Sequence, residues 1–208
     1  MFTPIQETLL ILTSMGNQLK KALASLVSED RINDEDLKFT LSNHIHILLC
    51  SFLDEWKVLE SMGQNITIQN TLKIASPAVK HIRKWKGLEQ VRNKLLAHGQ
   101  RHNNRAPAWP WEVFAVYDAP TRYAETILLG KCALVSIDTA FIRHQKEYDE
   151  SAKVLQEVNR TISDKGIQTI GEIKSELTRI KSEMLGIARK ISALQENPPL
   201  KNRLEADQ

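Results

Sequence analysis

Apolar residues recur three and four positions apart along most of this chain, which is the spacing of helices buried on one face. The pattern is longest near the C-terminus, where it runs for three and a half heptads through Ile170, Ile173, Leu177, Ile180, Met184, Ile187, Ile191 and Leu194. A strict heptad of this kind is the seam of a coiled coil. We therefore predict an all-α fold, in which a helical bundle precedes a long, heptad-patterned C-terminal helix.

Capping residues and breaks in the pattern predict the order of the helices. Thr3, Pro4 and Gln6 match an N-cap, an N1 proline and an N3 partner. We expect a loop with a helical turn over 66–75, and a helix that opens at Ser76 and Pro77. A long helix is predicted from Thr121 toward Val158, with a kink near Gly130. The predicted divisions are a bundle over 1–160, a coiled-coil helix over 161–197 and a frayed tail over 198–208.

The bulk composition is that of an ordinary globular protein, with 208 residues, 42% hydrophobic and 25% charged. Glu7 interrupts the N-terminal apolar run, so no signal peptide is expected. The apolar run 127–142 contains Lys131 and Asp138, which favours a buried helix over a membrane span. Cys50 and Cys132 lack metal-site spacing and are expected to be free thiols of a cytoplasmic protein.

Positive charge is concentrated in the middle of the chain. Between Lys80 and Arg105 there are eight basic residues and one acid, Glu89, whereas the rest of the chain is net negative. Such an asymmetry indicates a face that binds a polyanion, although a solvated charged helix gives the same pattern. Nucleic acid is the polyanion that we expect.

The stretch from Arg92 to His98, with the sequence RNKLLAH, lies in this basic region. Six positions on an α-helix rotate a side chain by about 240° and advance it by about 9 Å, so the two side chains diverge within one chain. His98 shares its stripe with Val91 and Leu95, and a polar imidazole there needs a partner. A two-fold dimer brings two copies together and places both Arg–His pairs in one cleft.

These seven residues resemble the signature of the HEPN superfamily, in which an Arg is followed after four to six residues by a His, with a polar residue next to the Arg. The abortive-infection branch of bacterial HEPN proteins is the most similar. The resemblance covers residues 1–160 at most and implies a helical-bundle homodimer that cleaves RNA without a metal, as a toxin or phage-defence effector. Arg92 and His98 are then the catalytic pair, and Asn93 is a supporting polar contact.

One position departs from the family. In one HEPN branch a Tyr stands two residues after the His and is modified by the partner, whereas this chain has Gln100. Control by that modification is therefore not expected here. A protein partner or antitoxin is expected to bind through residues 170–194.

The chemistry needs no metal or cofactor. An imidazole with a pKa near neutrality suits the removal of a proton from an RNA 2′-hydroxyl, and a guanidinium suits the stabilisation of charge on the attacked phosphate. The expected products carry a 2′,3′-cyclic phosphate and a 5′-hydroxyl. Six further residues are predicted to bind the RNA backbone: Lys84, Lys86, Lys94, Arg101, His102 and Arg105.

A second class of function fits the same residues. Many HEPN domains only bind, and an Arg and a His on one helix often have structural roles. The alternative is a non-catalytic helical dimer, which binds nucleic acid or nucleotide through its basic face and a protein partner through its coiled coil. Trp109 and Trp111, beside prolines, suit either base stacking or core packing.

Overall fold

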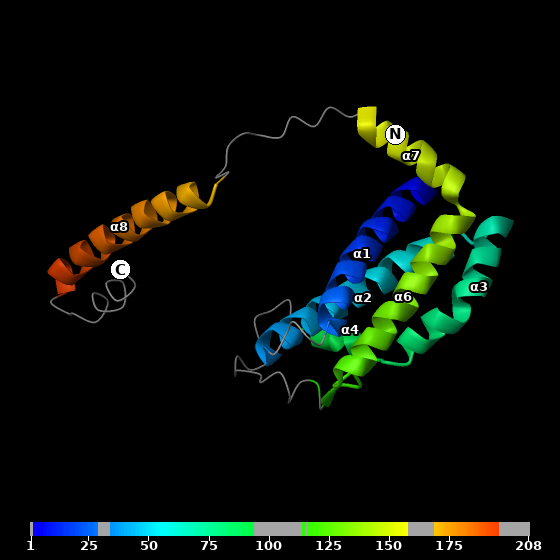
Figure 1. Cartoon of the computed structure of the whole chain (residues 1–208), viewed down its shortest axis with the longest axis horizontal. Coiled ribbons are helices and arrows are strands. Elements are labelled where there is room, and N and C mark those ends of the chain that lie inside the picture. Colours follow the sequence, from blue (N-terminus) through cyan, green and yellow to red (C-terminus); the bar gives the residue numbers. More distant parts are fainter. Residues whose placement is uncertain (1, 29–33, 94–113, 115, 158–168, 196–208) are drawn as a thin grey trace. The chain divides into compact units, whose positions relative to one another are not determined.

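The computed structural model describes residues 2–28, 34–93, 114, 116–157 and 169–195. The chain divides into two compact units, Met1–Val158 and Asn159–Gln208, each of which is described by itself. The described residues form seven helices and no strand (Figure 1). The all-α class predicted from the periodicity is confirmed.

The first two helices begin at the side-chain caps that the sequence offers. Helix α1 (Pro4–Val27) starts with a complete capping box, in which Thr3 accepts from the backbone of Gln6 and the Gln6 side chain accepts from Thr3. Helix α2 (Glu35–Ser61) is capped by Asp34, whose carboxylate accepts from two backbone N–H groups at 3.0 and 3.1 Å.

Helix α3 (Ile66–Arg83) differs from the prediction, because it runs without interruption through Pro77. Asn65 starts it by accepting hydrogen bonds from the backbone of Thr67 and Ile68 at 2.8 and 3.4 Å. The predicted loop over 66–75 and the predicted start at Ser76 are therefore wrong. The buried face continues on both sides of Pro77 and outweighs the one backbone hydrogen bond that proline cannot donate; its members are Ile68, Thr71, Ala75, Val79 and Ile82.

Helices α6 (Tyr123–Arg143) and α7 (Gln145–Glu157) replace the single long helix predicted from Thr121. The break lies at His144, which leaves helical geometry (φ −123°, ψ 30°) and buries its side chain with Nε2 3.1 Å from the Thr71 hydroxyl. At Gly130, where a kink was predicted, α6 continues without a break. Gly130 has another role, since a Cβ there would lie 3.0 Å from a methyl of Leu23, and its absence lets α1 and α6 approach closely.

One hydrophobic core joins these helices. Helix α1 packs against α2 and α6, and α3 packs against α6 (Figure 1). The largest fully buried side chains are Phe52 and Trp56, whose ring centroids lie 5.3 Å apart, surrounded by leucines and isoleucines from α1, α2, α3 and α6. This core fixes the C-terminal half of α2, from which one wall of the candidate site is built.

A buried histidine makes the stability of the bundle depend on pH. His46 is 1% exposed, lies 3.3 Å from the Thr126 hydroxyl, and has no partner for Nδ1 among the described residues. Burial lowers the pKa of His46 to about 4, because the charged imidazole loses its solvation. His144 shifts in the same direction, also through burial.

We therefore expect the free energy of unfolding to be greatest above pH 6.5 and to fall as the pH drops toward 4. In that window the unfolded histidine takes up a proton that folded His46 does not, which removes up to about 3 kcal/mol. Urea unfolding at pH 7.5 and at pH 4.5 measures the difference. In His46→Gln much of it should disappear, and an unchanged difference in that variant would contradict this origin.

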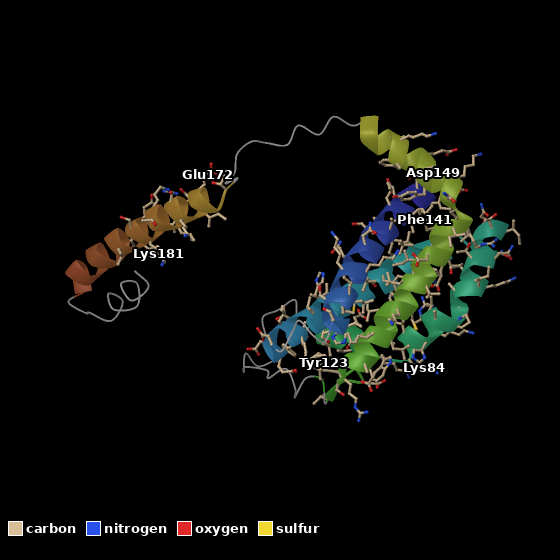
Figure 2. All side chains as sticks on the ribbon, viewed as in Figure 1. Lys84, Tyr123, Phe141, Asp149, Glu172 and Lys181 are labelled. Carbon is tan, nitrogen blue, oxygen red and sulfur yellow. The ribbon has the colours of Figure 1, made fainter. Side chains whose placement is uncertain are left out.

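Helix α8 (Ile170–Gln195) forms the described part of the second unit. Thr169 and Glu172 cap its start reciprocally, at 2.9 and 3.2 Å. Figure 2 shows Glu172 and Lys181 along this helix. Within the described ranges, none of the helices is both long and apolar enough to cross a membrane.

Candidate functional site

The predicted site residues are only partly within the described chain. Arg92, Asn93, Lys84 and Lys86 are described. The others lie outside the described residues: His98, Lys94, Arg101, His102 and Arg105, together with Trp109 and Trp111. The geometry around Arg92 is therefore the part of the site that can be built from contacts.

Arg92 directly follows a single turn of helix. Helix α4 (Leu88–Val91) follows α3 after a short turn, and the backbone at Arg92 remains helical (φ −54°, ψ −53°). Leu88 is part of the main hydrophobic core, whereas Val91 is buried in a small second cluster with Ala119. The predicted helix through His98 is thus seen over its first turn only.

Gly87 fixes where α4 begins. Its N–H donates to the Asp118 carbonyl at 2.7 Å. A Cβ on Gly87 would lie 2.6 Å from the Asp118 backbone nitrogen, so this close approach excludes any side chain.

The Arg92 guanidinium is held from two sides. Nη1 donates to Oδ2 of Asp54 on α2 at 2.9 Å, and Nε donates to Oδ1 of Asn93 at 3.1 Å. Two of the five guanidinium N–H donors are thus used by described residues. The Arg92 side chain is 25% exposed, so it lies at the surface with its orientation set. Asn93 contacts Arg92 directly, as a supporting residue would.

The pairing changes the titration of both partners. The hydrogen bond to Asp54 raises the pKa of Arg92 above its ordinary value. Partial burial acts to raise the pKa of Asp54, but hydrogen bonds from Arg92 and from Lys57 outweigh it and leave that pKa below its ordinary value. Both groups are therefore ionised near neutral pH.

An open pocket of about 160 Å³ lies beside Arg92. Helix α2 provides one wall, and the segment from the end of α3 through α4 provides the other. Four basic, two acidic and four largely apolar side chains line it. The ten lining residues are Cys50, Leu53, Asp54, Lys57, Arg83, Trp85, Lys86, Leu88, Glu89 and Arg92. An excess of cations in an open hollow suits an anionic ligand.

Some of the basic side chains that line the pocket already form ion pairs with carboxylates, and others do not. Arg83 makes a two-pronged contact with Glu60 at 2.8 and 2.9 Å, and Lys57 pairs with Asp54 at 3.3 Å. Lys86 is exposed and forms no ion pair with any described carboxylate. Lys86 and the remaining donors of Arg92 are therefore the groups in this pocket best placed to take a ligand.

Lys84, also predicted to bind RNA, is the residue that ends α3 and is exposed there (Figure 2). It does not line the pocket. Of the two predicted lysines described, the structure brings only Lys86 together with Arg92.

Other reactive groups in the described chain are poorly suited to catalysis. Cys50 lines the pocket but is 4% exposed, and burial raises its pKa to about 11, so it remains a neutral thiol at physiological pH. Cys132 is also free, with a pKa raised by burial. No group of three or more His, Cys, Asp or Glu side chains in the described part is arranged to hold a metal ion.

Asp54 is the site residue that the sequence analysis missed. It lies 38 positions before Arg92, and nothing in the local pattern of α2 marks it as different from other exposed acids. No protein-family model, curated protein or solved structure matches this chain.

Proposed function

We propose that this chain is a HEPN-type, metal-independent endoribonuclease in which Arg92 and His98 form the catalytic pair. The observation that carries the proposal is the fixed guanidinium of Arg92, held by Asp54 and Asn93 at the edge of an open, cation-lined pocket. A group that is already oriented stabilises developing charge without reorganisation during the reaction. The motif supplies the imidazole six residues later in the chain.

In this proposal, each residue has a separate task. His98 takes the proton from the RNA 2′-hydroxyl as the oxygen attacks the adjacent phosphorus. Arg92 donates to the phosphoryl oxygens, on which negative charge accumulates. Lys86 holds a neighbouring phosphate, and Asn93 and Asp54 act as positioning residues for Arg92. As the bond between O2′ and phosphorus forms, the bond between phosphorus and O5′ breaks, and O5′ takes up a proton that the protonated His98 returns through solvent. The products are a 2′,3′-cyclic phosphate and a 5′-hydroxyl.

Two copies of the chain share the cleft in this proposal, because Arg92 and His98 diverge on one helix. The remaining functional assignments are also proposals: RNA as the ligand, a role as a toxin or phage-defence effector, a protein partner or antitoxin, and a cytoplasmic location. Six further positions extend or flank the site in the sequence, namely Lys84, Lys86, Lys94, Arg101, His102 and Arg105.

The alternative is a module that binds nucleic acid or nucleotide without cutting it. The ion pair between Arg92 and Asp54 favours this reading, because it offsets the guanidinium charge and gives Arg92 a structural role. In the alternative, Lys84 and Lys86 contribute salt-sensitive contacts to the phosphate backbone.

Incubation of the full chain with mixed RNA in excess EDTA separates the two functions. The ribonuclease should produce fragments with cyclic phosphate ends, and His98→Ala should abolish these fragments. The matched control is His44→Ala, which replaces an exposed histidine on α2 and should leave cleavage unchanged. RNA that is bound but not cut by the wild-type chain supports the alternative. Cleavage retained by His98→Ala would reject the ribonuclease.

A further inference from the structure

Helix α8 exposes the apolar seam that the heptad pattern marks. Five side chains of the seam are between 39% and 58% exposed: Ile173, Leu177, Ile180, Met184 and Ile187. A continuous apolar stripe of this length on a helix indicates a surface that another element covers. The question is which element covers it.

Helix α7, the last described helix of the first unit, uses part of its surface within the bundle. Ser151 is fully buried, and Tyr148 packs edge-on against Phe141 at a centroid distance of 4.8 Å. Helix α7 also packs along α1. Tyr148 and Ser151 of α7 therefore already have neighbours within the bundle.

The charges beside the seam are complementary to a second copy of α8 in one orientation. With Ile173 and Ile180 at d, the residues at g are Glu176 and Glu183, and those at e are Lys174 and Lys181. In a parallel assembly, a residue at g of one helix lies beside the residue at e of the neighbouring helix that is five positions further along the sequence. Glu176 of one chain therefore lies beside Lys181 of the next. In a centred antiparallel pair, Glu183 meets Glu183 and Lys181 meets Lys181, and these two repulsions offset the attraction between Glu176 and Lys190.

Both g carboxylates are oriented on their own helix by one arginine. Arg179, on the outer face, donates from Nε to Glu176 at 2.9 Å and also contacts Glu183. These i, i+3 and i, i+4 contacts hold the glutamates along the helix flank. Helix α8 thus presents an ordered row of acids beside the apolar seam and lysines on its other side.

The residue types in the seam indicate the number of strands. β-branched Ile occupies three of the four d positions, at 173, 180 and 187, whereas the central a positions hold Leu177 and Met184. Ile at d with Leu at a favours three or four strands over two, because a two-stranded core packs β-branched side chains poorly at d.

We propose that α8 is a parallel self-assembly helix, which joins three or four copies of the chain through the seam from Ile170 to Leu194. The occupant of the exposed seam is the same helix of a neighbouring chain. This inference does not depend on the reaction proposed for Arg92, since it concerns a different unit of the chain.

Sedimentation equilibrium of the full chain tests the assembly. The expected mass is that of at least three chains, and a monomer or a simple dimer would overturn the proposal. Ile180→Asp should lower the mass to a dimer or monomer, because a carboxylate cannot be buried in the seam. Ser182→Asp, on the outer face of the same helix, is the matched control and should leave the mass unchanged. An unchanged mass in Ile180→Asp would show that another surface holds the chains together.

A cysteine in the seam tests the orientation. In a parallel assembly, residue 173 lies beside its own counterpart, so Ile173→Cys should form a disulfide-linked dimer under mild oxidation. In the centred antiparallel alternative the two copies of residue 173 are ~27 Å apart, which forbids a disulfide. Two controls measure the background level of disulfide formation. One is Ser175→Cys, on the outer face of α8, and the other is the parent chain, in which Cys50 is buried and Cys132 is half-buried. An assembly that fails to cross-link through residue 173 would overturn the parallel arrangement.

Discussion

Replacing Arg92 with alanine should slow RNA cleavage in EDTA by about 10²- to 10³-fold, the effect of removing one fixed donor that stabilises transition-state charge. The guanidinium is oriented by Asp54 at 2.9 Å and by Asn93 at 3.1 Å, so the variant loses a donor whose direction is already set. Single-turnover cleavage of a labelled RNA, with enzyme in excess, measures the chemical step directly.

The matched variants distinguish a role in the reaction from a role in folding. The Arg92–Asp54 pair is partly exposed, with side chains 25% and 56% accessible, so its loss should change the free energy of unfolding by about 1 kcal/mol or less. Lys131→Ala, an exposed cation of α6, should cleave normally. Arg92→Lys should recover little activity, because a lysine lacks the planar fork that contacts both Asp54 and a phosphate. Cleavage by Arg92→Ala within a few-fold of wild type would reject the assignment.

Truncation of Phe52 to alanine should lower the free energy of unfolding of the bundle by about 3 to 5 kcal/mol. Phe52 is fully buried and packs against Trp56, so its removal leaves a cavity where α2 meets the core. Urea unfolding followed by tryptophan fluorescence reports this change in the bundle alone, because all four tryptophans precede residue 112 and α8 has none.

Val58→Ala provides the control on the same helix. Val58 is 43% exposed, so the loss of its two methyl groups should cost less than about 1 kcal/mol. Similar losses in the two variants would mean that Phe52 is not in a close-packed core. Because Asp54 lies between Phe52 and Trp56 in the chain, Phe52→Ala should also weaken the orientation of Arg92.

Local signals predicted the helices that depend on local contacts. The capping box at Thr3 and Gln6 is visible in the sequence, because its two residues lie three positions apart. The heptad of α8 is likewise a local repeat. In these segments, propensity, capping and burial all favour the same structure.

The predictions failed where distant contacts outweigh local preference. The β-branched Ile66, Thr67 and Ile68 and the later Pro77 argue against a helix, but the buried face of α3 overrides them. A cue was present in Asn65, a good N-cap residue. The break at His144 had no such cue, since it depends on the contact with Thr71.

The candidate site shows the same division. The motif that begins at Arg92 can be recognised in the sequence, because its residues are close together in the chain. Asp54 and the pocket wall that α2 provides cannot be recognised in this way, because α2 lies far from Arg92 in the sequence. An isolated acid on a helix surface has no pattern that distinguishes an Arg partner from a solvated side chain.

The hydrogen bond between Gly87 and Asp118 means that the chain leaves the bundle and returns to it at nearly the same place. A segment whose ends are joined in this way can change in length at little thermodynamic cost, since doubling a loop costs only about 0.6 kcal/mol in closure entropy. Helix α4, and with it Arg92, is therefore held in place by a contact with a residue 31 positions after Gly87, so that its position does not depend on the length of the segment between them.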